Sequence, residues 1–345
     1  MSRLQAVVIG GGRNPEHEVS LASAAAVAAG LDRSRYDVIA LTIDRAGHWR
    51  DDAGIEIGLA RAIDVLRGCD VAIPMVHGRL GEDGALAALC ELTGVPYVGS
   101  GIGAGAIGMD KRVTKLLANA AGIPTAAAVL LDRTTAHAYR FREPVVVKPV
   151  SAGSSVGVSL VTSAAALTDA VAAALAVDDH ILVEERLEGR EIDVAVLRLA
   201  GGATIVTPPL EIVVDGVFDR GTKYGGHAVF RVPAVLHDEE RWELERAAER
   251  MYDALDCSGV ARIDFFLTSD GPVLNEVNTT PGFTAQSQVP RMFAAAGIRY
   301  SELLDLLVEG ALAQRQTADA RPDAPPSAHP TQQVEGCSAS PEIMA

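Results

Sequence analysis

The sequence is poor in aromatic residues, in cysteine and in net positive charge. Only 4% of its 345 residues are Phe, Trp or Tyr, so we expect a core of aliphatic side chains and alanine. The formal net charge is -15, which repels a phosphate backbone at long range, and no dense Lys/Arg cluster reverses that balance. These features exclude nucleic acid as an expected partner. A few local cations could still attract an anionic small molecule.

Cysteines and long apolar runs are also scarce. The four cysteines, at positions 69, 90, 257 and 337, show neither the paired spacing of metal ligands nor the density of a disulfide framework, so we expect reduced thiols. No apolar run reaches the roughly 20 residues needed to cross a bilayer. No basic segment followed by an apolar one opens the chain. We therefore expect a cytoplasmic protein with no membrane partner.

The first hundred residues alternate short β-branched runs with alanine-rich helical stretches. Because strands that alternate with helices form parallel sheets, this pattern predicts an α/β class with a doubly wound parallel sheet. A run of small residues then predicts a domain boundary near residue 100, and a single helix is expected after it. The expected strands are 4–9, 36–43, 70–76, 96–98, 126–131, 144–148, 156–161 and 181–185, and the expected helices are 20–31, 60–66, 85–92, 109–121 and 164–176.

Two apolar, β-branched runs near residue 270 are separated by a Ser-Asp-Gly turn, which predicts an antiparallel hairpin. Because side chains alternate faces along a strand, Arg262 and Asp264 share one face, and Glu276 and Asn278 share one face of the partner strand. Asp264, Glu276 and Asn278 offer the hard oxygen ligands that Mg²⁺ prefers. The planar donor fork of Arg262 suits a phosphate or an oxyanion. Taken alone, the pattern also fits a solvated polar face.

A lysine and a glycine- and serine-rich loop indicate a phosphate site. Lys148 ends an apolar strand just before the loop at residues 151–157. Glycines let the backbone approach a phosphate closely, and serine hydroxyls such as that of Ser155 add donors. Lys111 lies upstream in the same unit. The loop is not a Walker A loop, which requires G-x-x-x-x-G-K-[ST], and an ordinary hairpin loop is the alternative.

Three further features have a structural and a functional interpretation. The charged segment at residues 183–191 is either a linker or one wall of a purine slot, with a carboxylate on the ribose. His77 follows an expected strand at the edge where open α/β sheets bind ligands, and its glycine-rich, charged surroundings favour a ligand group over a core residue. Glu16 lies at a helix N-terminus, where it either caps the helix or holds a substrate ammonium group.

A dinucleotide-binding domain is the first alternative that the N-terminal segment raises. A triple-glycine turn at residues 10–12 follows a strand and precedes a helix. The third glycine of G-x-G-x-x-G would fall at Pro15, where a rigid ring replaces the residue needed for close helix–strand packing. This spacing argues against an NAD-dependent dehydrogenase.

Five motifs in order carry a resemblance that covers residues 4–313. They are Glu-His-Glu-Val-Ser at residues 16–20, His-Gly with Gly-Glu-Asp-Gly at residues 77–84, Met-Asp-Lys at residues 109–111, Lys-Pro with Gly-Ser-Ser-Val-Gly at residues 148–157, and residues 275–283 followed by Ser287. With these motifs the chain resembles the D-alanine–D-alanine ligases of the ATP-grasp superfamily. The resemblance implies a doubly wound N-terminal domain, residues 1–100, followed by two α+β lobes, residues 101–185 and 186–315. We expect a disordered tail at residues 316–345, because this segment is rich in Pro, Ala, Ser and Gln and lacks periodicity.

The resemblance also implies an activity and a set of site residues. ATP would activate one D-alanine as an acyl phosphate, and a second D-alanine would displace phosphate to give D-alanyl-D-alanine for peptidoglycan precursor synthesis. We expect a homodimer and two Mg²⁺ ions, with Mn²⁺ as an alternative. The implied residues are Lys111, Lys148, Ser155, Glu184, Leu187 and Glu191 for ATP; Asp264, Glu276 and Asn278 for the metals; Glu16, Ser154, Tyr224, Arg262 and Gly282 for catalysis; and His77, Lys223 and Ser287 for substrate.

One loop departs from the family pattern. At residues 215–233 the Lys223-Tyr224 pair is kept, but Arg220 stands where an aromatic residue is expected, and the stretch from Tyr224 to Pro233 is about one residue short. Because a closing loop shapes the second substrate pocket, a ligase that joins D-alanine to another D-amino or D-hydroxy acid, or a natural-product dipeptide ligase, is a further alternative. A catalytically inactive nucleotide-binding regulator would be expected to have lost metal ligands, and all three are present.

Overall fold

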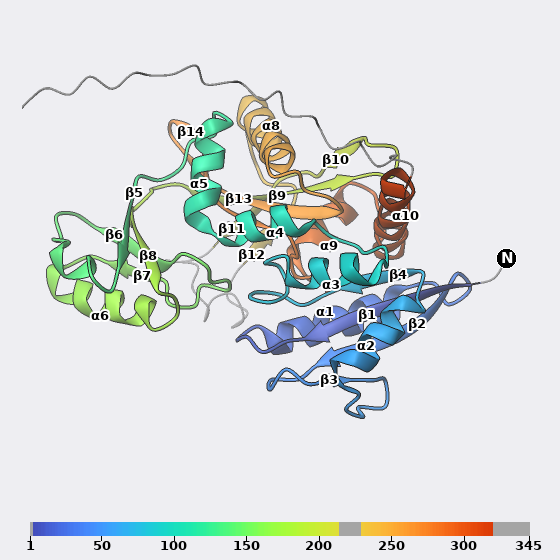
Figure 1. Cartoon of the computed structure of the whole chain (residues 1–345). Coiled ribbons are helices and arrows are strands. Elements are labelled where there is room, and N and C mark those ends of the chain that lie inside the picture. Colours follow the sequence, from blue (N-terminus) through green and yellow to red (C-terminus); the bar gives the residue numbers. More distant parts are fainter. Residues whose placement is uncertain (1–2, 214–228, 320–345) are drawn as a thin grey trace, which may run out of the picture.

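The computed structural model describes residues 3–213 and 229–319. Its N-terminal part is a four-stranded sheet with strand order β3-β2-β1-β4, in which β1, β2 and β4 are parallel and β3 is an antiparallel edge strand (Figure 1). Helices pack on both faces, as a doubly wound sheet requires. The elements are β1 (Leu4–Gly11), α1 (His17–Gly30), β2 (Tyr36–Ile43), β3 (Trp49–Arg50), α2 (Gly58–Arg67), β4 (Val71–Pro74) and α3 (Ala85–Thr93).

Strand β1 illustrates how the sequence specifies these layers. Successive side chains of a strand point to opposite faces. Val7 and Ile9 pack in a core cluster with residues of α2 and α3, whereas Ala6 and Val8 pack in a second cluster with Val27 of α1 and residues of the C-terminal helix. Both faces are therefore buried, which explains why β1 is a continuous apolar run.

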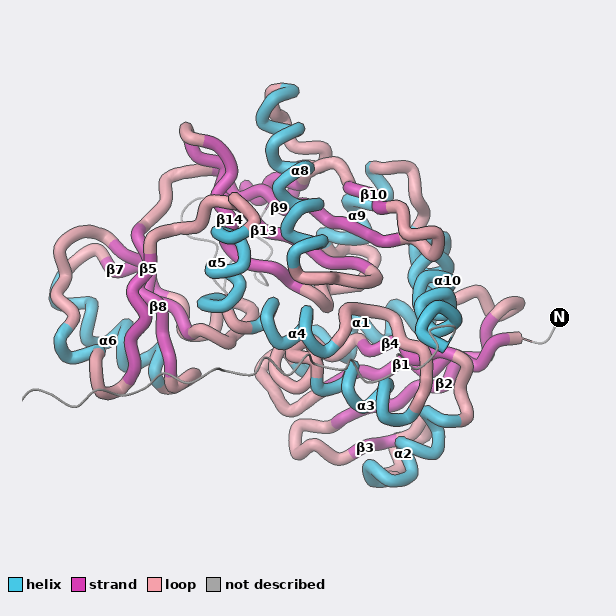
Figure 2. The backbone as a smooth tube through the Cα atoms, turned by 45° about the horizontal axis from the view of Figure 1, so that its top comes forward, coloured by secondary structure: helices cyan, strands magenta, loops and turns pink. Residues whose placement is uncertain are grey.

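The central lobe is an antiparallel sheet with strand order β5-β8-β6-β7, and helix α6 packs on it. Figure 2 shows this lobe set to one side of the rest of the molecule. The elements from the N-terminal domain through this lobe are α4 (Ile102–Met109), α5 (Lys111–Ala120), β5 (Ala128–Asp132), a 3-10 turn (Ala136–Ala138), β6 (Val145–Pro149), β7 (Ser159–Val161), α6 (Ala164–Leu175) and β8 (His180–Glu185).

The C-terminal lobe contains a sheet with strand order β12-β11-β9-β13-β14, to which β10 is added beside β9. The predicted hairpin is confirmed as β13 and β14. Its apolar residues Ile263, Phe265 and Val277 pack against α8, so the polar residues of the same strands face the opposite side. The elements are β9 (Arg190–Arg198), β10 (Thr204–Val206), β11 (Leu210–Val213), β12 (Val229–Arg231), α8 (Asp238–Ala254), β13 (Val260–Thr268), β14 (Gly271–Asn278), α9 (Gln288–Ala295) and α10 (Tyr300–Asp319).

The segment after residue 100 differs from the prediction. The small-residue run forms helix α4, and the single helix expected at 109–121 begins only at Lys111. Asp110 separates the two helices because its backbone is extended and its carboxylate accepts a hydrogen bond from the Val113 amide. Glycine is required in α4 for close packing, since a Cβ on Gly105 would lie 2.6 Å from the Glu82 carbonyl oxygen.

Two further predictions, a strand at 96–98 and a tail that begins at residue 316, were also wrong. The strand expected at 96–98 contributes only an isolated bridge between Ala72 and Tyr97. Helix α10 continues to Asp319, so residues 316–319 do not belong to the expected tail, and residues 320–345 lie outside the part that the structure describes. Over residues 3–213 and 229–319, no helix combines the length and the apolar character needed to cross a membrane.

Candidate functional site

Two cavities meet at one wall. The first, of about 530 Å³, lies between the sheets of the central and C-terminal lobes. The second, of about 460 Å³, is lined by the start of α1, the loop around Ser154 and the segment that leads into α9. Arg262 and Gln288 line both cavities. A group bound in one cavity would therefore lie next to a group bound in the other.

The first cavity contains a buried carboxylate shared by two ammonium groups. The Nζ atoms of Lys115 and Lys148 each lie 2.8 Å from an oxygen of Glu184. Burial opposes ionisation of Glu184, but the two lysines outweigh it and lower the pKa of this carboxyl. Burial also lowers the pKa of Lys115. With both lysines charged, the trio keeps one net positive charge in a buried wall, which suits an anionic ligand such as a phosphate chain.

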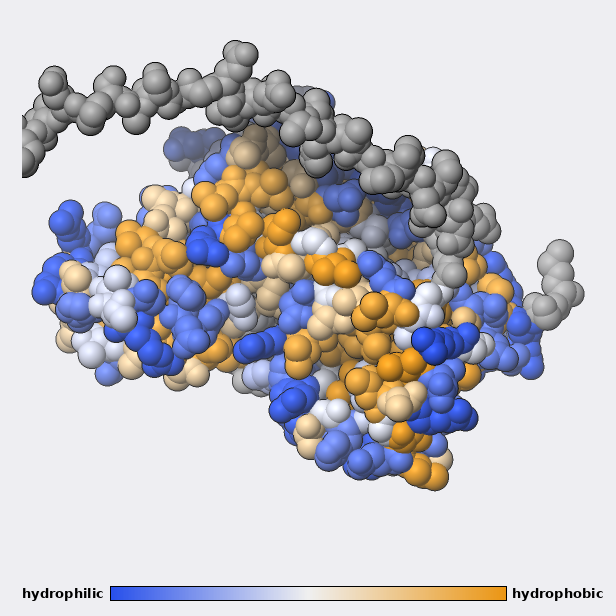
Figure 3. All heavy atoms as spheres, in the orientation of Figure 1, coloured by the Kyte–Doolittle hydropathy of each residue, from blue (hydrophilic) through white to orange (hydrophobic). Residues whose placement is uncertain are grey.

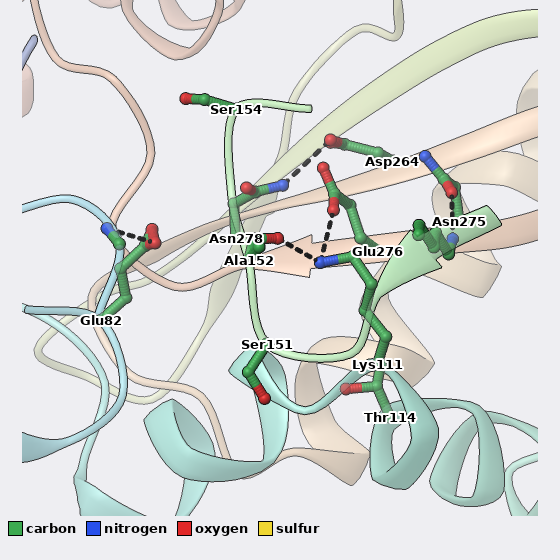
Figure 4. Close-up of polar contacts among 12 residues, drawn as sticks. Glu82, Lys111, Thr114, Ser151, Ala152, Ser154, Asp264, Asn275, Glu276 and Asn278 are labelled. Carbon is green, nitrogen blue, oxygen red and sulfur yellow. Dashed lines mark hydrogen bonds and ion pairs between the residues drawn. The ribbon is translucent and has the colours of Figure 1, made fainter. Parts of the chain in front are cut away.

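Lys111 joins three parts of the site at the start of α5. Its Nζ donates a hydrogen bond to the Ala152 carbonyl at 2.7 Å and lies 3.2 Å from Glu276 on β14 (Figure 4). Lys148, at the end of β6, donates to the side chain of Asn275 at 3.2 Å. The two lysines thus approach the same strand from different elements.

The loop after β6 connects the central lobe to the N-terminal domain. Ser154 and Ser155 both adopt left-handed backbone conformations, with φ of 50° and 55°, which are uncommon for residues other than glycine. The Ser154 hydroxyl donates a hydrogen bond to the Glu16 carboxylate at the start of α1. Gly153 permits this approach, because a Cβ there would lie 2.7 Å from Glu16 Oε2.

The polar face of the hairpin closes the wall between the cavities. Asp264 lies opposite Glu276, and Arg262 lies opposite Asn278. The Arg262 guanidinium donates to both oxygens of Asp264 at 2.7 Å, and the Asn278 amide donates to Asp264 Oδ2 at 2.9 Å. Burial opposes the charge on Arg262, but Asp264 and Asp193 outweigh it and raise the pKa of the guanidinium.

The expected metal ligands lie together on this face (Figure 4). Asp264 and Glu276 are carboxylates and Asn278 is an amide, a donor set of hard oxygens that fits a divalent cation such as Mg²⁺. Among the residues that the structure describes, no group of three His, Cys, Asp or Glu side chains is arranged to hold a metal. The candidate metal site is not a group of that kind, because its third ligand, Asn278, is an amide.

The structure places the other predicted residues in the two cavities, except for two. All six residues expected around ATP line the first cavity. Glu16, His77, Ser154, Gly282 and Ser287 line the second. Lys223 and Tyr224 lie outside the described residues, as do Arg220 and most of the loop that departs from the family pattern. These positions agree with the predicted roles but do not test them.

His77 lies at the second cavity, and protein atoms also contact its ring. The side chain is buried, and its ring nitrogens are hydrogen-bonded to protein atoms: Nδ1 lies 2.7 Å from the Thr280 carbonyl and Nε2 lies 2.8 Å from Ser23 Oγ. Burial lowers the pKa of the imidazole. A neutral ring would donate from Nδ1 and accept from Ser23, whose hydroxyl oxygen also accepts from the Phe283 amide. His77 therefore supports the segment that carries Gly282.

Several residues of the site were missed by sequence reasoning. Lys115 could have been found, because it lies four positions after Lys111 and so on the same helix face. Asp193 is a buried acid within an apolar strand, which is itself unusual. Glu82, Asn275 and Gln288 were also given no role, although Glu82 and Asn275 belong to two of the quoted motifs.

Glu82 is the most strongly shifted acid of the second cavity. Burial raises the pKa of its carboxyl to about 8, the negative charge of Glu16 adds to this, and a hydrogen bond from the Gly78 amide opposes it. Below pH 8 the folded protein therefore keeps Glu82 protonated, whereas the unfolded chain loses this proton near its ordinary value of 4.5.

We predict that stability falls with rising pH because of this residue. The folded state binds the extra proton between about pH 4.5 and 8, so the free energy of unfolding decreases across that range, by on the order of a few kcal/mol, and levels off above it. Glu82→Gln should remove this slope. Melting curves of the substrate-free wild type and variant at pH 5.5, 7 and 8.5 would measure it, and parallel pH dependence in both proteins would refute the shift.

A cavity between the sheets of two α+β lobes, next to a second cavity lined by a doubly wound domain, is the arrangement of an ATP-grasp ligase. The family model described as D-ala D-ala ligase C-terminus matches residues 117–309, and the N-terminus model matches residues 5–64 and 56–100. The chain belongs to the D-alanine–D-alanine ligase family.

Curated relatives and solved structures agree with this assignment. D-alanine–D-alanine ligases of Mycobacterium tuberculosis strain H37Rv and of Nocardia farcinica are each 40% identical, over 90% and 91% of this chain and 96% and 98% of theirs. The VanG D-Ala:D-Ser ligase of Enterococcus faecalis has a TM-score of 0.80 at 32% identity, covering 90% of this chain and 100% of that one. The D-alanine–D-alanine ligase of Bacillus anthracis complexed with ATP has a TM-score of 0.76 at 28% identity, over 91% and 99%.

Proposed function

We propose that the protein joins two D-alanine molecules into D-alanyl-D-alanine and converts ATP to ADP and phosphate. One structural observation carries the proposal: the wall shared by the two cavities holds Arg262 together with the oxygen ligands Asp264, Glu276 and Asn278. The extensive similarity to D-alanine–D-alanine ligases supports the choice of substrate. The product would be a peptidoglycan precursor, and the use of ATP supports a cytoplasmic location.

The first cavity would bind ATP. Lys111 and Lys148 would hold its phosphates, with Ser155 of the loop after β6 as a further donor, and the segment that contains Glu184, Leu187 and Glu191 would contact adenine and ribose. Asp264, Glu276 and Asn278 would hold two Mg²⁺ ions, or Mn²⁺, which reduce the negative charge of the phosphates when bound. Arg262 lies beside these ligands, where its donors can face a transferring phosphoryl group.

The second cavity would bind the two D-alanines. Glu16 would hold the ammonium group of the first, and its hydrogen bond to Ser154 fixes the carboxylate that does so. Ser287 at the N-terminus of α9 would contact the carboxylate of the second. We expect Lys223 and Tyr224 to complete this pocket from the loop at residues 215–233.

The chemistry requires no covalent enzyme intermediate. A carboxylate oxygen of the first D-alanine attacks the γ-phosphorus, and the bond from that phosphorus to the β–γ bridging oxygen breaks to release ADP. The neutral amine of the second D-alanine then attacks the acyl carbon, the bond from that carbon to the phosphate oxygen breaks, and the phosphate leaves with a proton from the amine. The protein aligns the reactants, and Arg262 and the Gly282 amide stabilise the oxyanion.

A substrate panel tests the proposed function. Purified protein with ATP and MgCl₂ should release one phosphate per D-alanyl-D-alanine formed, and L-alanine should give no product. D-alanine paired with D-serine or D-lactate tests the alternative that the unusual loop raises. Faster product formation with either pair than with D-alanine alone would identify a D-alanine–D-X ligase instead.

We also propose a homodimer. Apolar side chains are exposed along α3, α4 and α5, where Leu92, Ile102 and Leu116 are 82%, 42% and 64% exposed, and Figure 3 shows hydrophobic atoms gathered over these helices. Exposed apolar side chains gathered in this way are typical of a protein interface. Light scattering of the purified protein would measure the mass, and a monomer at micromolar concentration would refute the dimer.

A further inference from the structure

Arg262 is held by two sets of partners, Asp264 and the pair formed by Gln288 and Asp193. Its Nε and Nη2 donate to Asp264 on the same strand. Its Nη1 donates to Gln288 Oε1 at 2.8 Å, and Gln288 Nε2 donates to Asp193 Oδ2 at 2.7 Å. Asp193 Oδ2 also lies 3.4 Å from Arg262 Nε. The Gln288 amide thus joins a cation and a carboxylate.

Strand pairing explains why Arg262 needs these partners. Asp193 on β9 and Asp264 on β13 are directly opposite each other in the antiparallel register, and like charges at such positions repel. Both side chains are nearly buried. Arg262 lies within ion-pair distance of both carboxylates, so Asp264 and Asp193 share its guanidinium.

We propose that Gln288 is a positioning residue that, together with Asp193, keeps the Arg262 guanidinium in the wall between the cavities. The inference rests on the proposed function, in which Asp264 is also a metal ligand. An Asp264 carboxylate that binds a cation forms weaker hydrogen bonds with Arg262. Gln288 and Asp193 then keep the guanidinium in place. Only a side chain with an acceptor toward Arg262 and a donor toward Asp193 can do this.

The orientation of the Gln288 amide follows from its neighbours. Its oxygen must face the guanidinium and its nitrogen must face the carboxylate, because the reverse would place a donor against a donor and an acceptor against an acceptor. Leucine at this position removes both hydrogen bonds. Glutamate preserves the shape, but when ionised it adds a third carboxylate beside Asp193 and Asp264.

The first experiment compares Gln288→Leu with the wild type in steady-state assays of phosphate release. We expect kcat to fall about ten- to a hundred-fold, the effect of losing a hydrogen bond to a charged group. The dissociation constant for ATP should remain within about twofold of the wild type. Gln314→Leu, an exposed change of the same type on α10, is the matched control and should have wild-type activity. A normal kcat with a raised KM for D-alanine would show direct substrate contact and overturn the positioning role.

The second experiment tests whether protonation of a carboxyl at position 288 restores kcat. In Gln288→Glu the new carboxyl faces Asp193 from β9, Arg262 and Asp264 from β13 and Glu276 from β14, with Glu16 and Glu82 across the second cavity. A protonated carboxyl can donate to Asp193 and accept from Arg262, as the amide does. The kcat ratio of variant to wild type should therefore rise as pH falls from 8.5 to 6.

A double variant tests the same pairing without a change of pH. In Asp193→Asn combined with Gln288→Glu, the donor and acceptor exchange places and the total charge returns to that of the wild type. The double variant should recover most of the kcat lost in Gln288→Glu at pH 8. A pH-independent activity ratio, together with a double variant no better than the single one, would refute the proposal.

Melting temperatures separate this inference from the proposed function. Relative to the wild type, Gln288→Glu should lose thermal stability progressively between pH 5.5 and 8.5, and Asp193→Asn should restore it, whether or not D-alanine is the substrate. If the wild type fails to make D-alanyl-D-alanine but these stability changes appear, the proposed function is refuted and the positioning role of Gln288 is supported. If the ligase is active and the stability changes are absent, the positioning role of Gln288 is refuted.

Discussion

Replacement of Glu276 by Gln or of Asp264 by Asn should each lower the rate of phosphate release by at least about a hundredfold at millimolar Mg²⁺. Each change removes a negative charge from the proposed metal site and keeps the shape of the side chain. The expected loss corresponds to roughly 3 kcal/mol of transition-state stabilisation, within the several kcal/mol that a bound metal can supply. Phosphate release with saturating ATP and D-alanine, titrated with MgCl₂, would measure it.

The hairpin itself supplies the control. Asp270 is exposed at the turn between β13 and β14, so Asp270→Asn makes the same charge change about one strand length away and should leave the rate unchanged. Circular dichroism should show that all three variants are folded. Glu276→Gln also removes the ion pair with Lys111, but Lys111 keeps its hydrogen bond to Ala152. Near-normal turnover in either site variant would remove that residue from the metal site.

The hairpin was predictable because its information is local. Strand alternation alone places Arg262 and Asp264 on one face and Glu276 and Asn278 on one face of the partner, and the observed register brings them together. The lysine and the loop at residues 148–157 were predictable for the same reason, since an apolar strand followed by glycine and serine is a local pattern. The role of each of these residues remains a prediction.

Contacts between distant segments were not predictable in this way. Gln288 and Asp193 are separated by 95 positions, and nothing near either residue indicates the other. The run of small residues at 99–105 predicted only a domain boundary, and glycine is a weak helix former, but packing of α4 against the Glu82 backbone outweighs that preference. His77 was predicted to bind a ligand because its neighbours are polar, and its partners Ser23 and Thr280 are contributed by other parts of the chain.

Replacement of Arg262 by Met should lower kcat by about a hundredfold or more, as loss of one oxyanion donor typically does. The structure adds a second expected effect. Arg262 pairs with both Asp193 and Asp264, which are opposite each other in the strand register. Its loss removes a positive charge that two buried carboxylates share, and we expect a lower melting temperature in the absence of Mg²⁺. ATP affinity in the presence of Mg²⁺ should change little. A fall in ATP affinity in step with the rate would indicate a structural role only.

Replacement of Arg262 by Lys distinguishes the two roles more sharply, because lysine keeps the positive charge but lacks the planar fork. An ammonium group can still pair with Asp193 and Asp264, so most of the stability lost in Arg262→Met should return. The guanidinium donates twice to Asp264 and once to Gln288, and its remaining donors can face the reacting groups. The ammonium group of lysine has too few donors to do all of this. We therefore expect Arg262→Lys to be nearly as stable as the wild type yet far slower in product formation. Full activity in Arg262→Lys would show that charge alone suffices and would refute the oxyanion role.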